Sequence, residues 1–329
     1  MGCGASVDRA VNAEEMENLC AACAKEMMYM CLGPALENSA SIKVPAPGEV
    51  QTLKQNVADL KAAAEKLRTK EEKTEAPKAE AKEEPKDVAG KAMAFASGMV
   101  SAAAGAAKTG ADAVAGAAAG VTAKGIDLMA ESLQQLVTAI ESPFESVGSD
   151  IVQAKKDKID QVFRYQAGNV ALKQQGDAVL VVRGEAPYDQ IKYDAVKPNA
   201  VTEKLVDKCA KNLSAQMLTD CAEEIKNHAV TKVWQGSIDK YNDLSSQVAA
   251  IDFLSTTCGI KLVKIEFNLP EHIVNSIIDQ LAGLMADQEK ELRKESVGKS
   301  KNYPEAFPIV FSGVPLTLKT YKMVFPDAQ

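Results

Sequence analysis

The chain has 329 residues, with 38 basic and 45 acidic side chains and a net charge of −7. This length allows two globular domains, or one domain with a long irregular arm, at roughly 150 residues per domain. The acidic balance and the absence of a basic block argue against a nucleic-acid partner, because binding to phosphates requires clustered Lys and Arg. Two histidines leave little room for a His-ligated metal site or for imidazole acid and base catalysis.

The first six residues match the pattern for N-myristoylation. Gly2 becomes the terminal residue once Met1 is removed, small residues follow, and Ser6 stands where the pattern requires it. No basic region precedes an apolar core, so no secretory signal is expected, and the longest uncharged stretch, residues 92–107, is too short to cross a membrane. We therefore expect the chain on the cytoplasmic face of a membrane, either the plasma membrane or an endomembrane.

A single myristoyl chain binds a membrane only marginally, so stable attachment needs a second signal. Residues 1–45 carry three basic and six acidic side chains, a balance that an anionic leaflet would repel. The second signal is therefore predicted to be palmitate on Cys3, with Cys20, Cys23 and Cys31 as candidates for additional acylation. This N-terminus resembles that of dually acylated peripheral membrane proteins, and the resemblance covers six residues and implies attachment alone.

The cysteines of the first 45 residues also allow other interpretations. Seven cysteines in a cytosolic chain are expected to be thiols rather than disulfides. No second CxxC pair and no histidine lie near Cys20 and Cys23, so neither zinc nor any cofactor is predicted; Cu(I) held with nearby methionines is a weaker alternative. A stripe at helical spacing predicts an amphipathic helix from about Ala13 to Leu32, ended by Gly33-Pro34, which could lie in the membrane interface or pack on the core (Leu19, Cys23, Met27 and Met30).

Residues 46–87 are expected to form a short coiled-coil-like helix followed by a charged linker. Six residues have the a and d spacing of a coiled coil (Val50, Leu53, Val57, Leu60, Ala64 and Leu67). About two and a half heptads are present, which predicts either weak self-association through residues 50–67 or packing against the next helix. Residues 70–86 combine Lys and Glu with two prolines and are predicted to be a linker.

Residues 88–145 are expected to be an Ala/Gly-rich helical segment. The composition of residues 88–125 resembles that of the lipid-ordered helices of synucleins and apolipoproteins, which implies contact with lipid. A close-packed pair of alanine helices or a flexible spacer would have the same composition. From Ile126 the apolar spacing becomes that of an ordinary amphipathic helix, which is predicted to end before Pro143.

Residues 146–329 are predicted to be the folded part, an α+β domain with a small antiparallel or mixed sheet covered by helices. Helices are expected over residues 150–172, 205–225, 230–251 and 269–292. Strands are expected over residues 178–183 and 260–267, with a hairpin formed by residues 307–311 and 314–325. Cys209 and Cys221 fall on an apolar stripe and are predicted to lie in the core.

None of the common catalytic or nucleotide-binding motifs is present, so no catalytic, cofactor-binding or metal-binding residue is assigned. The preferred hypothesis is a lipid-anchored peripheral membrane protein that acts as a non-catalytic scaffold or adaptor, binding an unidentified protein through residues 146–329. One alternative is an enzyme or small-ligand-binding domain in those residues, tethered by the same anchor, which a concave site with convergent polar groups would favour. Another is a soluble coiled-coil or cytoskeletal protein, based on the heptads of residues 50–67.

Overall fold

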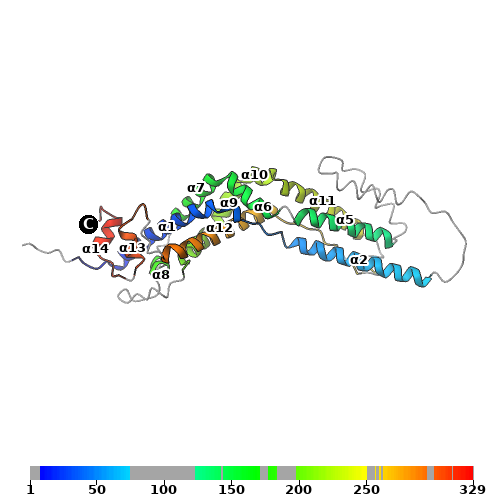
Figure 1. The fold of residues 1–329 in the computed structure, drawn as a ribbon, viewed down its shortest axis with the longest axis horizontal. Helices are drawn as coiled ribbons and strands as arrows, with labels where there is room; N and C mark the ends of the chain where they lie inside the picture. Colours follow the sequence, from blue (N-terminus) through cyan, green and yellow to red (C-terminus); the bar gives the residue numbers. More distant parts are fainter. Residues whose placement is uncertain are drawn as a thin grey trace, which may run out of the picture. The chain divides into compact units, whose positions relative to one another are not determined.

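In a computed structural model of the chain, the named elements of the described residues are helices (Figure 1). It describes residues 8–74, 123–141, 144–170, 177–183, 198–249, 256, 259–260, 262–294, 300–312 and 314–328. In these ranges 80% of the residues are helical and no β-strand forms. The predicted α+β fold with a small antiparallel or mixed sheet is therefore wrong.

The chain divides into two compact units that do not follow its linear order. The first unit comprises residues 1–44, 146–225 and 270–329, and the second comprises residues 45–145 and 226–269. Within the first unit, residues 8–44 pack with residues of the C-terminal half of the chain.

The core of the first unit is built around α1 (Ala13–Glu37). This helix contacts α7 (Lys156–Asn169), α8 (Asp177–Arg183), α9 (Ala200–Asp220), α13 (Ala306–Val310) and α14 (Leu318–Val324). Its largest apolar side chains are almost fully buried (Leu19, Met27, Met28, Leu32 and Leu36). Of the two alternatives for this helix, the structure therefore shows packing on the core. The helix continues past Gly33-Pro34, so its predicted end at Leu32 is wrong.

Three further helices belong wholly or mainly to the first unit: α6 (Phe144–Ala154), α10 (Ala222–Asn227) and α12 (Leu269–Lys294). The predicted helix over residues 150–172 is interrupted at Lys155, between α6 and α7. The stripe predicted over residues 205–225 is confirmed as α9 and α10, and Cys209 and Cys221 are buried as predicted.

The second unit packs α2 (Glu49–Thr74) along α5 (Ala123–Glu141), which also contacts α11 (Ala229–Ala249). All six heptad residues of residues 50–67 are buried, with Leu67 the most exposed at 8%. Of the two alternatives for the heptads, packing against the next helix is therefore what the structure shows. The ring of Trp234 on α11 lies 5.8 Å from that of Phe144 and 5.6 Å from that of Phe267.

The first predicted strand, residues 178–183, is helix α8. A short apolar run does not distinguish a strand from a buried helix, and contacts from distant residues decide the outcome here. The main-chain N–H of Ala178 donates to a carboxylate oxygen of Glu17 at 2.9 Å, and the buried Arg183 donates to the carbonyls of Val310 at 2.9 Å and Val314 at 2.7 Å. These contacts fix both ends of the helix.

The other predicted strands are also wrong. Residues 307–325 do not form a hairpin but the short helices α13 and α14. Residues 262–268 are not helical, yet they join no ladder, since the β-pairing within the described ranges consists of one antiparallel bridge between Ala10 and Thr317. The predictions for the charged linker and for the Ala/Gly-rich tract lie mostly at residues 75–122, outside the described residues.

Candidate membrane-anchor site

The predicted lipidation residues Gly2 and Cys3 lie outside the described residues, which begin at Asp8. What the structure describes is the place where the segment that carries them joins the first unit. We call this place the anchor junction and define it as residues 8–15 together with residues 316–319. It brings the two ends of the chain together.

Main-chain hydrogen bonds join the two halves of the anchor junction. The N–H of Val11 donates to the carbonyl of Leu316 at 3.2 Å, and the N–H of Leu318 donates to the carbonyl of Arg9 at 2.9 Å. Together they form the single bridge between Ala10 and Thr317. The start of the described chain is therefore held on the residues that lead into α14.

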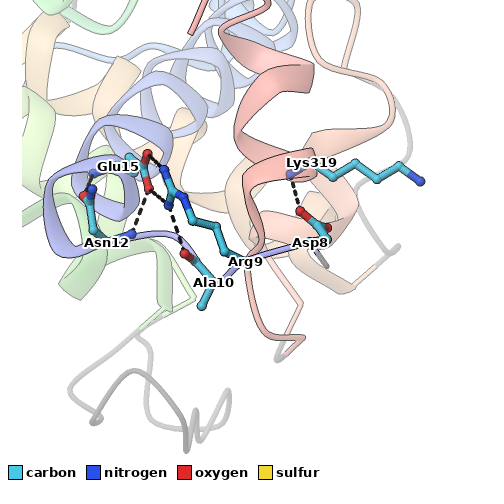
Figure 2. Close-up of polar contacts among 6 residues, drawn as sticks. All are labelled: Asp8, Arg9, Ala10, Asn12, Glu15 and Lys319. Carbon is cyan, nitrogen blue, oxygen red and sulfur yellow. Dashed lines mark hydrogen bonds and ion pairs between the residues drawn. The ribbon is translucent and has the colours of Figure 1, made fainter. Parts of the chain in front are cut away.

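Asp8 caps helix α14 from the opposite end of the sequence. Its carboxylate accepts a hydrogen bond from the main-chain N–H of Lys319 at 2.9 Å, as Figure 2 shows. The first N–H groups of a helix lack partners within it, and Thr317 at the cap position makes no capping bond through its side chain. Hydrogen bonds from Thr317 and from the Lys319 main chain hold the pKa of Asp8 below its ordinary value.

Arg9, Asn12 and Glu15 fix the direction in which the chain enters α1. The Arg9 guanidinium donates to both oxygens of the Glu15 carboxylate, at 2.6 and 2.7 Å. Asn12 and Glu15 form a capping box, in which each side chain accepts from the other residue's main-chain N–H at 2.8 and 2.9 Å. The hydrogen bond from Arg9 is the main reason that the pKa of Glu15 is lowered to about 2.

The anchor junction limits how far the first unit can lie from an attached lipid. Gly2 is six residues from Asp8, and a fully extended chain spans at most about 3.6 Å per residue, so the two are separated by at most about 22 Å. An acyl chain on Gly2 or Cys3 would therefore hold α14 close to the membrane surface.

The three cysteines considered for additional acylation lie inside the core. Cys20, Cys23 and Cys31 are free thiols with no exposed surface. Burial raises the pKa of Cys20 to about 12 and raises those of Cys23 and Cys31 as well. Acylation needs an accessible thiolate, so in the folded chain these thiols would become acceptors only after α1 left its packing.

Two surface depressions of the first unit were considered as possible sites. The larger of these, about 330 Å³, lies between α1 and residues 302–325, and the smaller, about 270 Å³, lies between α7 and α9. The larger contains one buried carboxylate, that of Glu26, which already accepts hydrogen bonds from the Ser300 hydroxyl at 3.1 Å and the Asn302 amide at 2.6 Å. Glu26 therefore serves to hold the chain at residues 300–302 on α1.

Within the described ranges, His, Cys, Asp and Glu side chains nowhere gather in threes as a metal ion would require. Of the helices described, none has the length and apolar character needed to cross a membrane.

Sequence reasoning missed the anchor junction, although part of it was recognisable. The pattern Asn12-x-x-Glu15 before an apolar run is a capping box and marks the start of α1. The contact between Asp8 and Lys319 had no local signal, because the two residues lie 311 positions apart.

Comparison with known proteins returned no matching family model, no matching curated protein and no matching solved structure.

Proposed function

We propose that the chain is a peripheral membrane protein anchored by myristate on Gly2 and palmitate on Cys3, and that it acts without catalysis as a scaffold or adaptor. One juxtaposition carries this proposal: an acylation pattern at residues 2–6 is followed directly by a segment, residues 8–12, that is hydrogen-bonded to the folded unit. Lipid attached at the tip would therefore position a folded body and not merely tether a flexible tail.

The two acyl chains have different roles in membrane attachment. Myristate alone gives reversible attachment, and a second chain on the adjacent Cys3 makes the attachment stable. The fixed junction at Asp8 then keeps the first unit near the cytoplasmic face, where a protein partner could bind the surfaces of residues 146–329. The proposed mechanism is recruitment of this protein partner to the membrane surface.

The alternative of an enzyme receives no support from the larger depression. Its buried carboxylate, Glu26, is occupied by Ser300 and Asn302 and has a structural role. A soluble coiled-coil protein is likewise less favoured, because the heptad residues on which it was based are covered within the second unit.

Membrane partition with metabolic labelling tests the proposal. Wild type, Gly2→Ala and Cys3→Ser are expressed in eukaryotic cells with clickable myristate and palmitate analogues, then separated into membrane and soluble fractions. We expect the wild type to carry both labels in the membrane fraction, Gly2→Ala to lose both the myristate label and membrane binding, and Cys3→Ser to keep myristate but bind reversibly. Gly4→Ala, the same change two residues away, is the matched control and should behave as wild type. An unlabelled, soluble wild type would refute the proposal.

A further inference from the structure

Residues 262–267 of the second unit form an extended segment held by side chains of α11 instead of by another strand. The Tyr241 hydroxyl donates to the carbonyl of Val263 at 3.0 Å. The Asn242 side-chain amide donates to the carbonyl of Ile265 at 3.0 Å and accepts from its N–H at 2.8 Å, as the main chain of a neighbouring strand would. The two-residue spacing of these contacts is that of a β-strand.

This arrangement leaves the other edge of the segment open. In an extended chain the N–H and C=O groups of successive residues point to alternate sides, so those of Lys264 and Glu266 point away from Tyr241 and Asn242. Among the described residues, no hydrogen bond engages the main chain of Lys264 or Glu266. Both residues are exposed, and the preceding residue, Val263, is 68% exposed. An unpaired, exposed edge with an apolar side chain is a template for strand addition.

We propose that this edge binds the same edge of a second copy of the chain, in antiparallel register about a two-fold axis at Ile265. In this register Lys264 of each copy lies directly opposite Glu266 of the other. Both residues present their main-chain groups to the partner, so each such pair exchanges two main-chain hydrogen bonds. Val263 lies opposite Phe267 of the other copy, which covers its exposed surface.

Charge selects this register over its neighbours. A two-fold axis at Lys264 would place lysine opposite lysine, and an axis at Glu266 would place glutamate opposite glutamate. Opposite charges across an antiparallel pair are stabilising and like charges are destabilising, so only the axis at Ile265 makes the edge self-complementary. This self-complementarity is the reason for choosing a second copy, rather than an unrelated peptide, as the partner.

The contact is short, and we therefore expect a weak dimer that depends on concentration. A pair of strands a few residues long buries less surface than a standard stable interface. Confinement to a membrane would raise the effective concentration of such an edge, but the pairing itself does not depend on lipid. It goes beyond the proposed function and can be tested without it.

The test measures the dimer dissociation constant of the full-length chain carrying Gly2→Ala, which removes the myristate acceptor. Sedimentation velocity is run from about 1 μM to about 1 mM, a range that includes weak association. Lys264→Glu or Glu266→Lys alone turns both symmetric pairs into like charges and should weaken dimerisation about 10- to 30-fold. The double variant Lys264→Glu/Glu266→Lys restores opposite charges and should recover the wild-type constant. Lys240→Glu, an exposed charge reversal on α11, is the matched control and should leave it unchanged.

Three results would overturn the proposal. The first is a wild-type chain that stays monomeric at the highest concentration. The second is a dimer that survives both single reversals, and the third is a double variant that fails to restore the dimer, because either of these two outcomes places the interface elsewhere, for example at residues 50–67. The substituted side chains are exposed, and an unchanged circular dichroism spectrum verifies that each variant is folded.

Discussion

Glu289 provides a sharp test of how the first unit is held together. Its side chain on α12 is completely buried and accepts hydrogen bonds from the main-chain N–H groups of Val201 at 3.1 Å and Thr202 at 2.8 Å, in the first turn of α9. It also pairs with Arg293, one turn further along α12, at 2.8 Å. One carboxylate therefore caps one helix and neutralises a buried cation on another.

The expected cost of Glu289→Ala follows from these partners. Removing one member of a buried ion pair typically costs about 3–5 kcal/mol, because it leaves a buried charge without compensation. Arg293 retains the carbonyl of Val181 at 2.8 Å and the ring of Phe311, with its guanidinium carbon 5.2 Å from the ring centre. These remaining contacts place the expected loss near the lower end, about 3 kcal/mol, although α9 also loses its cap.

Urea denaturation followed by circular dichroism measures the loss of stability, and amide hydrogen exchange at Val201 and Thr202 localises it to α9. Glu291→Ala is the matched control, since its carboxylate is 61% exposed and pairs only with the exposed Lys294. We expect that substitution to cost less than about 0.5 kcal/mol. Equal losses for the two variants, or unchanged exchange in α9, would contradict the assignment of Glu289 as the cap.

Two further predictions concern a close helix contact and the anchor junction. Gly148→Ala should destabilise the first unit by about 1–3 kcal/mol in urea denaturation, because the new methyl group would lie 2.8 Å from a side-chain carbon of Ile42. Gly33→Ala, whose new methyl would have no atom within 4 Å apart from the adjoining residues and its own helix backbone, should destabilise the unit less than Gly148→Ala does. Because the folded pKa of Glu15 is lowered from 4.5 to about 2, its contribution is present above pH 4.5 and lost as the pH falls towards 2. Protection of the anchor-junction amides against hydrogen exchange should fall over that pH range. Glu15→Gln should make this protection nearly independent of pH. If the variant shows the same pH profile as the wild type, Glu15 is not the group that causes the fall.

Apolar spacing predicted the long helices, because burial of one face requires that spacing whatever the partner. The heptads of residues 50–67 correctly identified the buried face of α2, and the Leu205 to Ile225 stripe identified that of α9 and α10. The partner of that face had no local signature, so self-association and packing on α5 could not be separated from the sequence.

The strand predictions failed because, in the segments where a sheet was expected, side chains from other parts of the sequence provide main-chain hydrogen bonds that a neighbouring strand would have provided. At Val263 and Ile265, within the predicted strand of residues 260–267, Tyr241 and Asn242 supply the main-chain hydrogen-bond partners in place of a second strand. For residues 178–183, Arg183 reaches the carbonyls of Val310 and Val314, more than 120 positions away. Local periodicity cannot encode either contact.

The same reasoning explains why the anchor junction matters for the proposed function. A lipid attached six residues from a fixed point would hold that point within about 22 Å of the lipidated residue. Asp8 and Arg9 are fixed by Leu318 and Lys319, so the junction is complete only when the last helix of the chain is folded in place. If Gly2 and Cys3 carry lipid as proposed, a change in α14 that breaks its contacts with Asp8 and Arg9 would lengthen the chain between the lipid and the first unit, without altering Gly2 or Cys3.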